Sequence, residues 1–102
     1  VATLDDFGGK YAIKVIFQEN EVAIFKLKDG FYAIGNLCTH RGGSLSNGRV
    51  ENDIVICPNH GGRYEVKTGK VVGPPPVQSV EKFEVTVIGN DIYLDYITSP
   101  LT

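Results

Sequence analysis

The residues best suited to chemistry lie in one stretch, residues 38–60. It begins Cys38-Thr39-His40, ends Cys57-Pro58-Asn59-His60, and contains both cysteines and both histidines of the chain. Each half pairs a thiol with an imidazole at short range, and 16 residues separate the two halves. Thiolate sulfur and imidazole nitrogen are ligands for zinc and for iron–sulfur centres. The stretch is therefore a candidate four-ligand metal site.

The ligand types carry a redox consequence. In a two-iron cluster the spacing allows Cys38 and Cys57 to bind one iron and His40 and His60 the other. The oxidised centre then has a formal charge of zero, whereas four thiolates would leave it at −2. A neutral centre accepts an electron more readily than a dianion. Known centres with this ligand set have reduction potentials of roughly −150 to +300 mV, against about −400 mV for plant-type ferredoxins, which agrees with the direction of the charge argument.

The paired motif resembles the signature of the Rieske [2Fe–2S] family. The glycines after each histidine, the pattern Tyr64-x-x-x-Thr68-Gly69 and the segment Gly73-Pro74-Pro75-Pro76 also match that family, and the resemblance covers nearly the whole chain. It implies one [2Fe–2S] cluster per chain. Its expected ligands are Cys38, His40, Cys57 and His60.

The resemblance also assigns roles to residues around the cluster. Tyr64 is expected to donate a hydrogen bond to the sulfur of Cys38, whereas Gly62 stands where disulfide-containing relatives have a serine donor. Gly43 stands where those relatives carry a disulfide cysteine. Pro74 and Pro75 belong to a loop expected to cover the cluster. With one donor lost, we expect a potential in the lower half of the Rieske range. The alternatives are a tyrosine that only packs and a stiff proline linker.

Other uses of the same residues remain open. A zinc site is possible, although a classical zinc finger orders its ligands Cys, Cys, His, His and this chain has Cys, His, Cys, His. The two cysteines could instead form a disulfide, Cys38 to Cys57. They could also be core residues that bind nothing, with both histidines on the surface.

Composition bounds the class of protein. The chain has 102 residues, 42% of them hydrophobic, and a net charge of −2, values typical of one globular domain. No apolar run approaches the roughly 18–20 residues that span a membrane, and there is no signal-peptide pattern. Reduced thiols suit the cytoplasm. We therefore expect a cytoplasmic protein with neither a membrane nor a nucleic-acid partner.

The rest of the sequence predicts short strands separated by turns. Asp29-Gly30 between two apolar runs predicts a hairpin, and no segment has a sustained helical period. We expect an all-β fold, a Rieske-type antiparallel β-sandwich or barrel. Its base would comprise residues 1–36 and 77–102, with an inserted cluster-binding subdomain at 37–76. The expected strands are 10–17, 21–28, 31–37, 49–50, 54–56, 63–66, 70–72, 80–88 and 92–97.

The resemblance implies an electron carrier rather than an enzyme, because the protein supplies all four ligands and leaves no coordination position for a substrate. The chain is similar to the ferredoxin components of aromatic-ring-hydroxylating dioxygenases, which carry electrons from a flavin reductase to a terminal oxygenase. The alternatives are the small Rieske subunit of a nitrite reductase, a Rieske domain of a larger redox complex and a zinc-stabilised binding module.

Overall fold

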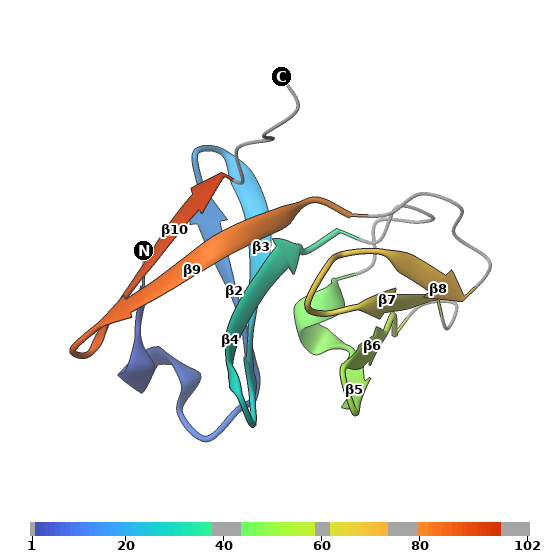
Figure 1. Cartoon of the computed structure of the whole chain (residues 1–102), viewed down its shortest axis with the longest axis horizontal. Coiled ribbons are helices and arrows are strands. Elements are labelled where there is room, and N and C mark those ends of the chain that lie inside the picture. The colour runs from blue at the N-terminus through green and yellow to red at the C-terminus, as the bar shows by residue number, and fades with distance from the viewer. Residues whose placement is uncertain (1, 38–43, 59–61, 74–79, 97–102) are drawn as a thin grey trace.

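The computed structural model describes residues 2–37, 44–58, 62–73 and 80–96, which form two antiparallel sheets (Figure 1). The six-stranded sheet has the order β1-β10-β9-β4-β3-β2, and the four-stranded sheet has the order β5-β6-β7-β8. The larger sheet comprises β1 (Ala2–Thr3), β2 (Ala12–Phe17), β3 (Asn20–Leu27), β4 (Gly30–Gly35), β9 (Lys82–Ile88) and β10 (Asp91–Tyr96). The smaller comprises β5 (Arg49–Glu51), β6 (Ile54–Ile56), β7 (Arg63–Glu65) and β8 (Val71–Gly73).

The predicted all-β, antiparallel fold class is confirmed. The described residues include no α-helix and only two short 3-10 helices, η1 (Leu4–Phe7) and η2 (Leu45–Asn47). Neither these nor strand β1 was expected from the sequence. Thr3 caps the N-terminus of η1. Its N–H donates to a carboxylate oxygen of Asp6 at 2.9 Å. No helix within the described ranges is long and apolar enough to cross a membrane.

Two-residue turns set the register of the large sheet. Gln18 and Glu19 join β2 to β3 with φ of +49° and +71°, the two positive values of a type I′ turn. The expected hairpin at Asp29-Gly30 is present, but its loop is Lys28–Asp29. Gly30 already pairs with Leu27 and has φ +150°, a conformation that favours glycine.

In the sequence, the small sheet is inserted between two strands that are neighbours in the large sheet. Strands β4 and β9 pair through Ala33 with Phe83 and Ile34 with Lys82. The chain leaves the large sheet after Gly35, and the N–H of Gly35 donates to the carbonyl oxygen of Glu81 at 2.7 Å where the chain returns. Residues 36–80 thus connect two adjacent strands, and all four strands of the small sheet lie among them.

Strand β3 separates two hydrophobic cores. Its residues Val22, Ala23, Ile24 and Phe25 are all fully buried, so both faces of the strand are covered. Val22 and Ile24 face the first core, together with Phe7, Ala33, Phe83 and Ile92. Ala23 and Phe25 face the second core, which also contains Ala12, Ile34, Leu45, Val55, Cys57, Tyr64, Val66 and Val80. The second core joins the two sheets.

A charged contact also links the sheets. The ammonium nitrogen of Lys67, after β7, lies 2.7 Å from a carboxylate oxygen of Asp29 and 3.4 Å from one of Asp53. It also lies 5.5 Å from the centre of the Tyr32 ring. The hydrogen bond from Lys67 lowers the pKa of Asp29, and the same bond raises the pKa of Lys67. All three charged groups are partly exposed, so the stabilisation is modest.

The Gly69→Ala variant should be strongly destabilised. Gly69 has φ +79°, and a Cβ there would overlap the carbonyl oxygen of Val80. The left-handed backbone and the overlap together should cost about 2–4 kcal/mol, a decrease in Tm of at least about 10 °C. Gly89→Ala is the matched control, because Gly89 has φ +62° and open space around it. Thermal melts followed by circular dichroism check this, and equal losses in both variants would contradict the close approach of Val80.

The Lys67→Met variant should lose stability in a pH-dependent way. Asp29 has a folded pKa below its ordinary 3.8, so the contribution of the pair is complete above that value and is lost as the pH falls through the folded pKa. Lys67 has a folded pKa above its ordinary 10.5, so the contribution is lost again as the pH rises through that folded value.

The Tm difference between wild type and Lys67→Met should therefore be constant from about pH 5 to pH 9 and should narrow below about pH 4. The matched control is Lys70→Met, since Lys70 is exposed in the same turn region. A Tm difference that keeps its full size at pH 3, relative to this control, would show that the ion pair is not its source.

Candidate metal centre

The structure places three of the residues predicted to form or surround the site. These are Cys57, Gly62 and Tyr64, all of which are buried. The other predicted site residues lie outside the described residues: Cys38, His40, Gly43, His60, Pro74 and Pro75. For these, the structure describes the ends of the segments to which they belong.

Cys57 lies where strand β6 ends. In that strand Val55 points into the second core, and the two-residue period of a strand turns Cys57 to the same side. The exposed fraction of Cys57 is 2%. Its N–H donates to the carbonyl oxygen of Gly62 at 2.7 Å, which extends the β6–β7 ladder one step beyond the pair Ile56–Arg63. The bond fixes both ends of the segment that contains His60.

The segment that contains Cys38 and His40 is also closed at its base. Leu37 and Ser44 form an isolated antiparallel bridge across its ends. One step outward, the N–H of Leu45 donates to the carbonyl oxygen of Asn36 at 2.7 Å. Leu45 is fully buried in the second core, so the return of the chain is anchored there.

The proline segment has a fixed end as well. The N–H of Val80 donates to the carbonyl oxygen of Gly69 at 2.9 Å, and Val80 packs in the second core. The next residue, Glu81, accepts from Gly35 at the end of β4. The chain therefore returns from the proline segment beside the point where it departs toward Cys38.

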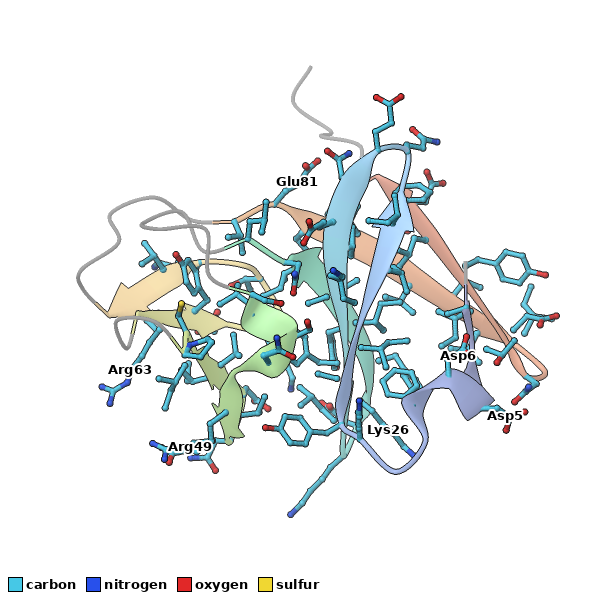
Figure 2. The ribbon with its side chains drawn as sticks, turned by 180° about the vertical axis from the view of Figure 1, so that it is seen from behind. Asp5, Asp6, Lys26, Arg49, Arg63 and Glu81 are labelled. Carbon is cyan, nitrogen blue, oxygen red and sulfur yellow. The ribbon has the colours of Figure 1, made fainter. Side chains whose placement is uncertain are left out.

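Tyr64 is in the middle of the small sheet and faces the same core as Cys57. It pairs with Val55 across β6 and β7, and its exposed fraction is 0%. The preceding residue, Arg63, is exposed. Figure 2 shows Arg63 and Arg49 projecting from the small sheet away from the large one. The alternation thus directs Tyr64 inward and Arg63 into solvent.

Sequence reasoning missed Asn36, which is fully buried and has five hydrogen bonds through its backbone and side chain. Asparagine is usually exposed and commonly marks turns. The one sequence feature that pointed to its burial is its position at the end of an apolar run, two residues before Cys38.

The residues fit an iron–sulfur centre. A thiolate buried as deeply as Cys57 is costly unless a cation accompanies it, and iron or zinc coordination supplies one. A set of two thiolates and two imidazoles is the ligand combination of a Rieske centre. Gly43 and Gly62, which follow the two histidines closely in the sequence, have no side chain that could compete with the expected ligands for iron.

Comparison with known proteins identifies the family. The sequence profile of the Rieske [2Fe-2S] domain matches residues 1–84. The chain is 33% identical to the biphenyl dioxygenase ferredoxin subunit of Pseudomonas sp. (strain KKS102) over 100 residues, covering 97% of this chain and 92% of that subunit.

Two solved structures have the same fold. The ferredoxin of carbazole 1,9a-dioxygenase from Nocardioides aromaticivorans IC177 has a TM-score of 0.85 at 32% identity, covering 95% of both chains. A chain in the complex of reduced oxygenase and oxidised ferredoxin in carbazole 1,9a-dioxygenase has a TM-score of 0.83 at 29% identity, covering 97% of this chain and 94% of that one. The protein therefore belongs to the Rieske [2Fe-2S] domain family, whose domain binds one [2Fe–2S] cluster per chain.

Proposed function

We propose that this protein is a ferredoxin that carries single electrons from a flavin-dependent reductase to a terminal, aromatic-ring-hydroxylating oxygenase in the cytoplasm. The observation that carries the proposal is the match to a dioxygenase ferredoxin subunit over 97% of this chain. Support for an oxygenase as acceptor comes from the similar chain in the oxygenase–ferredoxin complex. The reductase and the cytoplasmic location rest on the sequence resemblance.

The ligand assignment is part of the proposal. Cys38 and Cys57 would bind one iron, and His40 and His60 would bind the other, within a cluster-binding unit of residues 37–76. When bound, the cluster supplies a one-electron couple. Burial of Cys57 supports its assignment, because the second core excludes water from the thiolate side of the site. Gly43, Gly62, Pro74 and Pro75 would surround the cluster without donor side chains.

The purified protein should contain two irons and two acid-labile sulfides, and it should show a rhombic EPR signal after reduction by dithionite. With a flavin-dependent ferredoxin reductase and a terminal oxygenase, it should couple NADH oxidation to hydroxylated product. The His60→Ala variant should lose the EPR signal and the coupling.

Each failure has a separate meaning. A colourless protein with one zinc would identify a binding module and overturn the redox function. An intact cluster that accepts electrons from none of several flavin reductases would overturn the proposed donor and favour a role in another redox complex.

Tyr64 is proposed to tune the potential through a hydrogen bond from its hydroxyl to the sulfur of Cys38. Such a bond stabilises the reduced, more negative state, so Tyr64→Phe should lower the potential. A difference of about 1 kcal/mol between the two oxidation states corresponds to a shift on the order of 40 mV for one electron.

Protein-film voltammetry measures the midpoint potential of both forms. The control is Tyr32→Phe, because Tyr32 packs against the second core from the large sheet. If Tyr64→Phe changes only the Tm and leaves the midpoint unchanged, Tyr64 is a packing residue and has no tuning role.

A further inference from the structure

A buried amide joins the two sides of the first ligand segment. The Asn36 side chain has an exposed fraction of 0%. Its Nδ2 donates to Glu21 Oε1 at 3.1 Å and to Ser44 Oγ at 3.0 Å, and its Oδ1 accepts from the N–H of Ser46 at 2.8 Å. Both amide protons and the amide oxygen are therefore used.

The backbone of Asn36 is held by Glu21 as well, and by Leu45, which lies between Ser44 and Ser46. Its N–H donates to the carbonyl oxygen of Glu21 at 2.9 Å, and its carbonyl oxygen accepts from Leu45 at 2.7 Å. Strand β3, which contains Glu21, is the most deeply buried strand of the large sheet. The Asn36 amide, which precedes residues 38–43, thus ties residues 44–46, which follow them, to the rigid strand β3.

The hydrogen bonds form one connected network. Ser44 Oγ accepts from Asn36 and also hydrogen-bonds with Ser46 Oγ at 3.0 Å, where either hydroxyl can be the donor. The network extends from the Asn36 amide to Ser44 and Ser46 on one side and to the Glu21 carboxylate, which accepts, on the other. Such networks favour a single geometry when every member is satisfied. No buried side-chain nitrogen or oxygen among the described residues lacks a partner.

Asn36 lies two residues before Cys38, so its hydrogen bonds restrain the start of the first ligand segment. Leu37, the next residue, has an exposed fraction of 48%, so the chain leaves the interior directly after Asn36. Cys38 follows Leu37 in the sequence. An apolar side chain could fill a buried site at a strand end without any need for hydrogen bonds, whereas a buried amide is costly unless its partners are in place. Here those partners lie on both sides of residues 38–43.

We propose that Asn36 is a positioning residue for the ligand pair Cys38 and His40, acting through its hydrogen bonds to Glu21, Ser44 and Ser46. It sets where the two ends of the ligand segment lie relative to strand β3 and so restrains the ligand geometry. The inference rests on the ligand assignment proposed above.

The test reverses the polarity of the network. Asn36→Asp sets a carboxylate against the Glu21 carboxylate and removes both amide donors. Adding Glu21→Gln supplies an amide donor to the new carboxylate, Ser44 can donate to it, and the N–H of Ser46 keeps its acceptor. The double variant E21Q/N36D also leaves the formal charge of the pair unchanged. The Ser44→Ala variant is a milder probe that retains the Glu21 bond.

Three properties are measured on the protein with its cluster: the g values of the reduced EPR signal, the reduction potential and the rate of cluster loss to an iron chelator. Asn36→Asp should shift the g values and accelerate cluster loss about tenfold, with a smaller change for Ser44→Ala. E21Q/N36D should recover the wild-type g values and rate. The control Ile92→Val trims the first core, on the opposite face of β3 from the core that contains Cys57, and should lower the Tm without changing any of the three properties.

The inference is overturned if Asn36→Asp and Ser44→Ala behave like Ile92→Val, with a lower Tm and unchanged cluster properties. It is also overturned if both variants alter the cluster and the double variant recovers nothing, since the effect would then not pass through the Glu21–Asn36 bond. Failure of the ligand assignment looks different, because the wild-type protein itself would then lack the cluster or retain it in His60→Ala.

Discussion

Burial on both faces of β3 is the constraint on which the other features depend. Val22 and Ile24 close the core inside the large sheet, and Ala23 and Phe25 close the core between the sheets. A strand in this position cannot shift its register by one residue without exchanging the side chains of the two cores. The residues that the small sheet positions, including Cys57, therefore pack against a strand that has little freedom to move.

The second core holds the two sheets together and also contains two residues of the candidate site. Cys57 packs among residues from both sheets, and Tyr64 faces the same interior. Backbone hydrogen bonds hold the ends of the segments on either side, at Leu37 with Ser44, at Cys57 with Gly62 and at Gly69 with Val80. Residues 38–43 and 58–61, which contain the other proposed ligands, therefore lie between chain ends that the two sheets hold in place.

The sequence supports the ligand set and the fold class because ligand chemistry and two-residue periodicity are local properties. Strand β6 was predicted with its observed bounds, and most other strands differ only at their ends. The misses have physical reasons. The turn at Lys28–Asp29 depends on Gly30 adopting an extended strand position at positive φ, and β1 is too short to have a period. Asn36 was missed because burial of an amide depends on partners far away in the sequence, such as Glu21.

The insertion of residues 36–80 between β4 and β9 has an entropic consequence. Closing a flexible loop of that length costs about 3 kcal/mol more than closing a two-residue turn, by the logarithmic dependence on loop length. Only two residue pairs join β4 to β9, extended by the bond from Gly35 to Glu81. The small sheet lowers this cost, because its own hydrogen bonds shorten the flexible path between the two strands. Loosening the small sheet therefore weakens closure of the larger one, although the two sheets share no strand.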